Sequence, residues 1–166
     1  MIDGPTRAKW NEYLDAVSNA GGRNPIIGGG AVRDRLLGIV PNDVDIFYEG
    51  RLDYDAMATT FGAVVARDLS SVNNYDVPVD AIADVVTDDL ETVQFMRVDS
   101  VPARLKRFAA SISRAYYGSH VGLILTDAFL SSVETKTIHF DEWVSDAYRC
   151  KMINKFEPLG YTLKDR

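Results

Sequence analysis

Two aspartates separated by one residue, Asp43 and Asp45, are the side chains of this sequence best suited to chemistry. In a β-strand, side chains at positions i and i+2 point to the same face, so both carboxylates project together. Two like charges this close repel each other, and a divalent cation relieves the repulsion. Oxygen ligands shared with phosphates suit Mg²⁺ or Mn²⁺. The pair therefore predicts a metal site, although a DxD pair also occurs in exposed strands and in metal-dependent glycosyltransferases.

A glycine turn upstream of the aspartates predicts a phosphate-binding site. A short apolar strand is expected just before Gly29 and Gly30, and a helix over residues 31–37. A strand, a glycine turn and a helix start bring backbone N–H groups and the positive helix end to one spot, which binds phosphate. Glycine lets a phosphate approach the backbone because no Cβ is in the way. Arg33 lies one turn into the helix, within reach of a triphosphate, and Asp34 can orient Arg33 or bind a sugar hydroxyl.

These motifs resemble a known signature. Residues 26–38, IIGGGAVRDRLLG, followed by NDVDI at 42–46, resemble the head domain of bacterial-type tRNA nucleotidyltransferases and poly(A) polymerases, in the DNA polymerase β superfamily. The resemblance implies an α+β fold, the polymerase β-like nucleotidyltransferase palm, with a mixed β-sheet flanked by helices. It implies that the paired aspartates are catalytic and hold the metal, and that the glycine turn, Arg33 and Asp34 bind the nucleotide.

A weaker likeness continues downstream. Residues 106–113, KRFAASIS, resemble the family's Arg-Arg-Asp-Phe-Thr-Ile-Asn motif, with Ala109 in the place of the family's aspartate. Arg107 lies in this motif and is expected to bind the nucleotide. Residues 141–166 resemble the start of the family's neck helix with a tail, so one nucleotidyltransferase head-like domain is expected over 1–166. The neck residues that select CTP and ATP, and the body and tail that bind tRNA, have no match here, so we carry over neither base choice nor tRNA specificity.

A third acidic residue is often found in this superfamily on the strand after the DxD pair. The candidate strand, residues 92–98, has Thr, Gln and Arg on its inward face, and Glu91 and Asp99 lie only at its ends. Two functions therefore stay open. One is a template-independent nucleotidyltransferase that moves NMP from an NTP to a hydroxyl acceptor with Mg²⁺. The alternative is a degenerate nucleotidyltransferase-fold binding module without turnover. A DxD glycosyltransferase, the third reading, leaves the glycine turn and Arg33 unexplained.

Apolar spacing predicts the elements that position these residues. Helices are expected from a cap at Thr6 to Gly21 and over 53–61, 79–90, 102–108, 126–131 and 141–156; strands are expected over 43–48, 63–66, 92–98, 111–117, 121–125 and, as the last strand, 136–140, with a loop over 70–76. The mixture of strand pairs and helices also favours an α+β fold.

The amino-acid composition indicates a class of protein and a cellular location. Apolar residues make up 46% of the chain and charged residues 25%, an ordinary balance for a globular domain. Cys150 is the only cysteine, so no internal disulfide is possible, and a reducing, cytoplasmic location is expected. No apolar run approaches the roughly 20 residues of a membrane helix, so no membrane partner is expected.

The net charge and the distribution of charges along the chain indicate which partners to expect. The net charge of −6 argues against an extensive nucleic-acid surface, since phosphate neutralisation needs clustered Lys and Arg. Residues 68–96 contain seven acids and no base, whereas residues 97–114 contain five bases and one acid. The acidic stretch would repel a long RNA backbone. We therefore expect an NTP substrate and, as acceptor, a protein, a small molecule or a short RNA end. The basic residues Arg104, Lys106 and Arg114 are further candidates to help hold the triphosphate.

Overall fold

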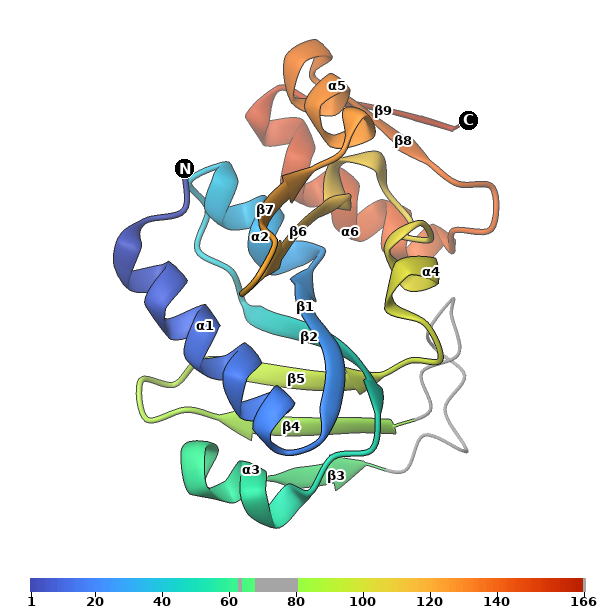
Figure 1. Cartoon of the computed structure of the whole chain (residues 1–166). Coiled ribbons are helices and arrows are strands. Elements are labelled where there is room, and N and C mark those ends of the chain that lie inside the picture. Colours follow the sequence, from blue (N-terminus) through green and yellow to red (C-terminus); the bar gives the residue numbers. More distant parts are fainter. Residues whose placement is uncertain (63, 68–80, 166) are drawn as a thin grey trace.

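A computed structural model describes residues 1–62, 64–67 and 81–165 of the chain (Figure 1). The strands are β1 (Gly22–Gly28), β2 (Asp43–Gly50), β3 (Val65–Arg67), β4 (Ala81–Val86), β5 (Thr92–Arg97), β6 (Ala115–Gly118), β7 (Gly122–Leu125), β8 (Thr137–Phe140) and β9 (Thr162–Asp165). The helices are α1 (Gly4–Asn19), α2 (Gly30–Leu36), α3 (Tyr54–Phe61), α4 (Val101–Leu105), α5 (Asp127–Thr135) and α6 (Asp146–Phe156), with 3₁₀ turns η1 (Ser111–Ser113) and η2 (Glu157–Leu159).

The described strands form a mixed seven-stranded sheet in the order β3-β4-β5-β2-β1-β6-β7, and β8 and β9 form a separate parallel pair. Within the large sheet, β2 and β5 pair in parallel, and the other neighbouring strands pair antiparallel. Helices α1 and α3 lie beside each other along the sheet, whereas α6 lies at the other end of the molecule, near α2 (Figure 1). The expected α+β architecture with a mixed sheet and flanking helices is confirmed.

The first helix begins earlier than predicted from the sequence. The Asp3 carboxylate accepts a hydrogen bond from the backbone N–H of Thr6 at 2.7 Å, and Pro5 occupies the first turn. Asp3 is therefore the N-terminal cap, and the helix begins at Gly4 instead of after Thr6. Trp10 and Leu14 are fully buried in the main hydrophobic core.

Strand β2 separates two environments. Val44, Ile46 and Tyr48 are buried in the main core that α1 and α3 cover. Asp43 and Asp45 are half-buried and line a cavity on the opposite face. The alternation of acidic and apolar residues predicted this strand, and its register against β5 confirms it.

The prediction of a helix over residues 79–90 is wrong. Strand β4 lies there and pairs antiparallel with β5. Ala83 and Val85 are buried while Asp84 between them lies toward the other face, which is the two-residue period of a strand. Pairing with β5 satisfies the backbone groups of this segment, so the tertiary partner overrides the local helical pattern. The loop expected over 70–76 lies outside the described residues.

The C-terminal third also differs in its boundaries. The Ser145 hydroxyl caps α6, which begins at Asp146, so the residues from 141 to 145 form a loop instead of a first helical turn. Helix α5 is capped by Thr126 as expected but continues to Thr135. A further strand, β9, follows the strand that was expected to be the last. The expected strand over 111–117 begins with the 3₁₀ turn η1, and β6 starts only at Ala115. Among the described residues, every helix is too short or too polar to span a membrane.

Candidate active site

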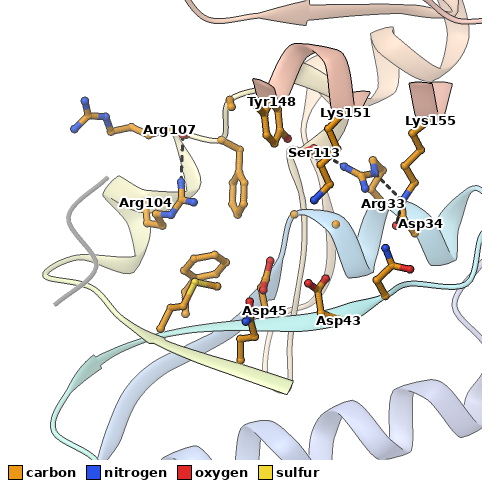
Figure 2. A pocket seen from close by; sticks show the side chains of 18 of the residues that line it. Arg33, Asp34, Asp43, Asp45, Arg104, Arg107, Ser113, Tyr148, Lys151 and Lys155 are labelled. Carbon is orange, nitrogen blue, oxygen red and sulfur yellow. Dashed lines mark hydrogen bonds and ion pairs between the residues drawn. The ribbon is translucent and has the colours of Figure 1, made fainter. Parts of the chain in front are cut away.

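A cavity of about 380 Å³ opens over the face of β2 and β5 that carries the aspartates, between α2, α4 and α6 (Figure 2). The seven residues predicted from the sequence to bind metal or nucleotide all line it: Gly29, Gly30, Arg33, Asp34, Asp43, Asp45 and Arg107. Of the three further basic candidates, Arg104 lines it, whereas Lys106 and Arg114 do not. The fold thus brings the glycine turn, the DxD pair and the basic segment after β5 to one place.

Asp43 and Asp45 lie side by side on the floor of the cavity (Figure 2). Burial, and then the neighbouring Asp43 carboxylate, raise the pKa of Asp45 from its ordinary value of 3.8 to about 7. The positive charges of Arg104, Lys151 and Arg33 oppose this rise without cancelling it. A carboxylate that is half-buried beside another carboxylate favours either a proton or a bound cation.

The strand beside β2 offers no carboxylate at the matching position. Gln94 on β5 lies directly opposite Asp45, and its side-chain amide donates a hydrogen bond to Asp84 on β4 at 3.0 Å. Among the described residues, no group of three or more His, Cys, Asp or Glu side chains is placed to hold a metal ion. A cation at the floor of the cavity would therefore have two protein carboxylates.

The glycine turn packs against an aromatic ring. Gly29 has φ +68°, and a Cβ added there would lie 2.8 Å from the ring of Phe108. A Cβ at Gly28 would lie 2.9 Å from the same ring, whereas one at Gly30 would meet only an Arg33 nitrogen at 3.6 Å. Glycine is therefore required at 28 and 29 by the close approach of Phe108, and Gly30 presents the more open backbone to the cavity.

Arg33 is buried and held from three sides. Its Nε donates to Asp34 at 2.7 Å, one terminal nitrogen donates to the Ser113 hydroxyl at 2.9 Å, and the guanidinium lies 5.0 Å from the ring centre of Phe156. The second oxygen of Asp34 accepts from Lys155 of α6. Because both Asp34 oxygens are engaged, the structure favours orientation of Arg33 over sugar binding for Asp34.

The basic segment after β5 contributes two arginines. The Arg104 guanidinium lies 4.9 Å from the ring centre of Phe47 and 4.6 Å from that of Phe108, and it donates to the carbonyl of Arg107 at 3.2 Å. Figure 2 shows the Arg107 side chain extending away from the aspartates, so Arg107 lies at the edge of the cavity. Arg114, another candidate, pairs instead with Asp141 at 2.7 Å.

One wall of the cavity was not anticipated from the sequence. Tyr148, Lys151 and Lys155 of α6 line it, together with Trp143 from the preceding loop. Figure 2 shows the Lys151 side chain directed toward the two aspartates. The spacing of these three α6 residues, i, i+3 and i+7, places them on one helix face, and this was the available signal.

The sequence matches no known protein-family model and no curated protein. Solved structures do share its fold. The complex of a CCA-adding enzyme with CTP is 17% identical, with a TM-score of 0.68, and the alignment covers 98% of this chain and 41% of that one. The Thermotoga maritima CCA-adding enzyme complexed with tRNA is 18% identical, with a TM-score of 0.70, over 98% of this chain and 40% of that one.

A structure described as a tRNA-processing enzyme is 22% identical, with a TM-score of 0.59, over 84% of this chain and 37% of that one. The chain thus spans about two-fifths of the length of these proteins. The resemblance to the head domain of the tRNA nucleotidyltransferases is confirmed at the level of the fold, which is the nucleotidyltransferase fold.

Proposed function

We propose that the chain is a metal-dependent nucleotidyltransferase that moves NMP from an NTP to a hydroxyl group of an acceptor and releases pyrophosphate. The observation that carries this proposal is one cavity with an acidic floor and a basic wall. Asp43 and Asp45 form the floor, and Arg33 and Lys151 lie across from them. This arrangement suits a metal–triphosphate complex, whose cation and phosphates need opposite charges in one place.

The residues on the floor fit Mg²⁺ or Mn²⁺. Mg²⁺ is usually bound through one or two carboxylates and completes its shell with water and substrate phosphates. The mutual repulsion that raises the pKa of Asp45 would be relieved by such a cation. When bound, the metal would polarise the reacting phosphate and stabilise the attacking and leaving oxygens.

The basic wall would position the triphosphate. Arg33 is already fixed by Asp34 and Ser113, so little conformational freedom is lost when it meets a phosphate. Lys151 extends from α6 toward the floor and would neutralise charge that develops on the departing pyrophosphate. Gly30 would let a phosphate approach the backbone of the turn that Gly29 and Phe108 shape, and Arg107 would close the outer edge.

The substrates follow from this chemistry. Solved structures with this fold include complexes with CTP, ATP and tRNA, which supports an NTP as the donor. For the acceptor we propose a protein, a small molecule or a short RNA end, because the net charge of −6 disfavours a long nucleic acid.

One observation favours a second function, a module that binds nucleotide without turnover. Gln94 lies where a third carboxylate would face Asp45, and Ala109 lines the cavity where the family motif has aspartate. Both replacements remove a negative charge, and a missing charge can abolish the activation of an attacking hydroxyl while nucleotide binding persists.

The test is incubation with each α-labelled NTP, Mg²⁺ or Mn²⁺ and total cell extract, with release of pyrophosphate measured in parallel. Labelled product and pyrophosphate are expected from wild-type protein and from the control Asp15→Asn, which changes an exposed carboxylate on α1. Asp43→Ala should release neither. Calorimetric binding of an NTP without pyrophosphate release would favour the binding module, and full activity in Asp43→Ala would rule out the proposed site.

A further inference from the structure

Three polar side chains form a row across the sheet, and two of them, Asp45 and Gln94, line the cavity. Asp45 on β2 is paired with Gln94 on β5, and Gln94 is paired with Asp84 on β4. Neighbouring strands of a sheet lie only about 4.7–4.9 Å apart, so paired residues on one face are close neighbours. Because Gln94 lines the cavity together with Asp45, it lies within reach of anything that Asp45 binds.

The hydrogen bond to Asp84 determines how the Gln94 amide is turned. Its Nε2 donates to Asp84 Oδ1 at 3.0 Å. The nitrogen of the amide is a donor and its oxygen is only an acceptor, so this hydrogen bond engages the nitrogen end of the amide. The carbonyl oxygen of Gln94 is therefore the end of the amide that Asp84 does not engage, and Gln94 lines the cavity beside Asp45.

A carbonyl oxygen beside two carboxylates is unfavourable unless something positive lies between them. Carbonyl and carboxylate oxygens together form a ligand set that Mg²⁺ and Mn²⁺ accept. We propose that Gln94 supplies the third protein oxygen to the metal held by Asp43 and Asp45, and that Asp84 is the positioning residue that turns this oxygen toward the metal. The proposal rests on the metal site of the proposed function.

With Gln94 as a ligand, the neutral residue at position 94 lowers the negative charge of the metal site without removing a ligand. A site with two charged oxygens and one neutral oxygen binds a bare divalent cation less tightly than a site with three carboxylates, since affinity follows ligand charge. The remaining positive charge is then available to the triphosphate oxygens. Gln94 therefore supplies a metal ligand at the position where the absence of an acidic residue indicated that a ligand was missing.

The test measures binding of Mn²⁺ alone to the full chain, by loss of the free-ion electron paramagnetic resonance signal. Gln94→Met, of similar length but without the oxygen, should weaken binding by about tenfold or more, and Gln94→Glu should bind at least as tightly as wild type. Asp84→Ala should weaken binding by about tenfold because the amide is no longer oriented. Asp84→Asn should stay close to wild type, since its amide oxygen still accepts from Gln94. Asp88→Ala, which removes an exposed acid from the turn after β4, is the matched control and should have no effect.

Unchanged Mn²⁺ affinity in Gln94→Met would overturn the ligand role. An equal loss in Asp84→Asn and Asp84→Ala would show that Asp84 acts through its charge, which overturns the positioning role. Thermal unfolding checks that each variant is folded, and Gln94→Leu, which also lacks the oxygen, replaces Gln94→Met if that variant is not. No Mn²⁺ binding in wild type, or binding unaffected by Asp45→Asn, would refute the metal site of the proposed function itself, an outcome distinct from loss of the Gln94 role alone.

Discussion

Replacing Asp45 with asparagine removes a charge that the fold holds at an energetic cost. Burial and the Asp43 carboxylate raise the pKa of Asp45 from 3.8 to about 7. A carboxyl group whose pKa rises on folding contributes most stability below its unfolded pKa, and that contribution is lost as pH rises through the folded pKa. Metal-free wild-type protein should therefore lose stability relative to Asp45→Asn between about pH 4 and pH 7.

The magnitude follows from the pKa. At about 1.4 kcal/mol for each pKa unit, a rise of roughly three units corresponds to about 4 kcal/mol at most above pH 7. Asp45 is half-buried, and water at the cavity floor screens part of the repulsion. We expect Asp45→Asn to be more stable than wild type by about 2–4 kcal/mol near pH 8, with little difference near pH 4.

The assay is urea unfolding with EDTA present, followed by circular dichroism near pH 4, 6 and 8. Asp15→Asn serves as the control for simple loss of an exposed negative charge, and its stability relative to wild type should change little over this range. An Asp45→Asn variant that is equally or less stable than wild type near pH 8 would refute the reasoning. So would a difference of the same size near pH 4, because the Asp45 carboxyl is then protonated in the folded protein and carries no charge.

Three further changes probe the walls of the cavity. Asp34→Ala leaves the buried Arg33 guanidinium without its carboxylate and should lower the free energy of unfolding by about 3–5 kcal/mol; a loss below about 1 kcal/mol would contradict the pairing. Gly29→Ala places a Cβ 2.8 Å from the Phe108 ring at φ +68°, so the free energy of unfolding in urea should fall by about 1–3 kcal/mol. The double variant Gly29→Ala with Phe108→Leu should lose less stability than the sum of the two single losses, because the smaller side chain removes the clash, and an additive loss would contradict this. Lys151→Met should weaken Mg²⁺–NTP binding by about tenfold in calorimetry at an unchanged melting temperature; unchanged affinity would remove Lys151 from the triphosphate site.

Local sequence pattern was sufficient for the elements whose spacing reflects burial on one face. Strand β2 alternates because one face meets the core and the other a polar cavity, and that alternation is visible in residues 43–48. The pattern failed at β4, where residues 79–90 have a helical spacing of acids. There, pairing with β5 decides the structure, and this partner is a tertiary contact that local spacing does not encode.

The same limit applies to the site. The sequence predicted the aspartates, the glycine turn and Arg33, because these residues lie close together along the chain and form a recognisable motif. It did not predict Lys151, which comes from a helix far along the chain and reaches the cavity only when α6 packs beside α2. The contact between Phe108 and the glycine turn was also missed, since the need for glycine at 28 and 29 arises partly from a ring that follows β5.

The central claim is that Asp43 and Asp45 form one site for a divalent cation and an NTP. The most direct test is the melting temperature of wild type with Mg²⁺, with each of the four NTPs, and with both together. Ligand at a hundredfold excess over its dissociation constant stabilises a protein by about 2.7 kcal/mol, or roughly 5–10 °C for a domain of this size. We predict that Mg²⁺ and one NTP together raise the melting temperature by more than the sum of their separate effects, and that Asp45→Asn abolishes this synergy. Synergy that persists in Asp45→Asn, or that is missing from wild type with all four NTPs, would contradict the claim.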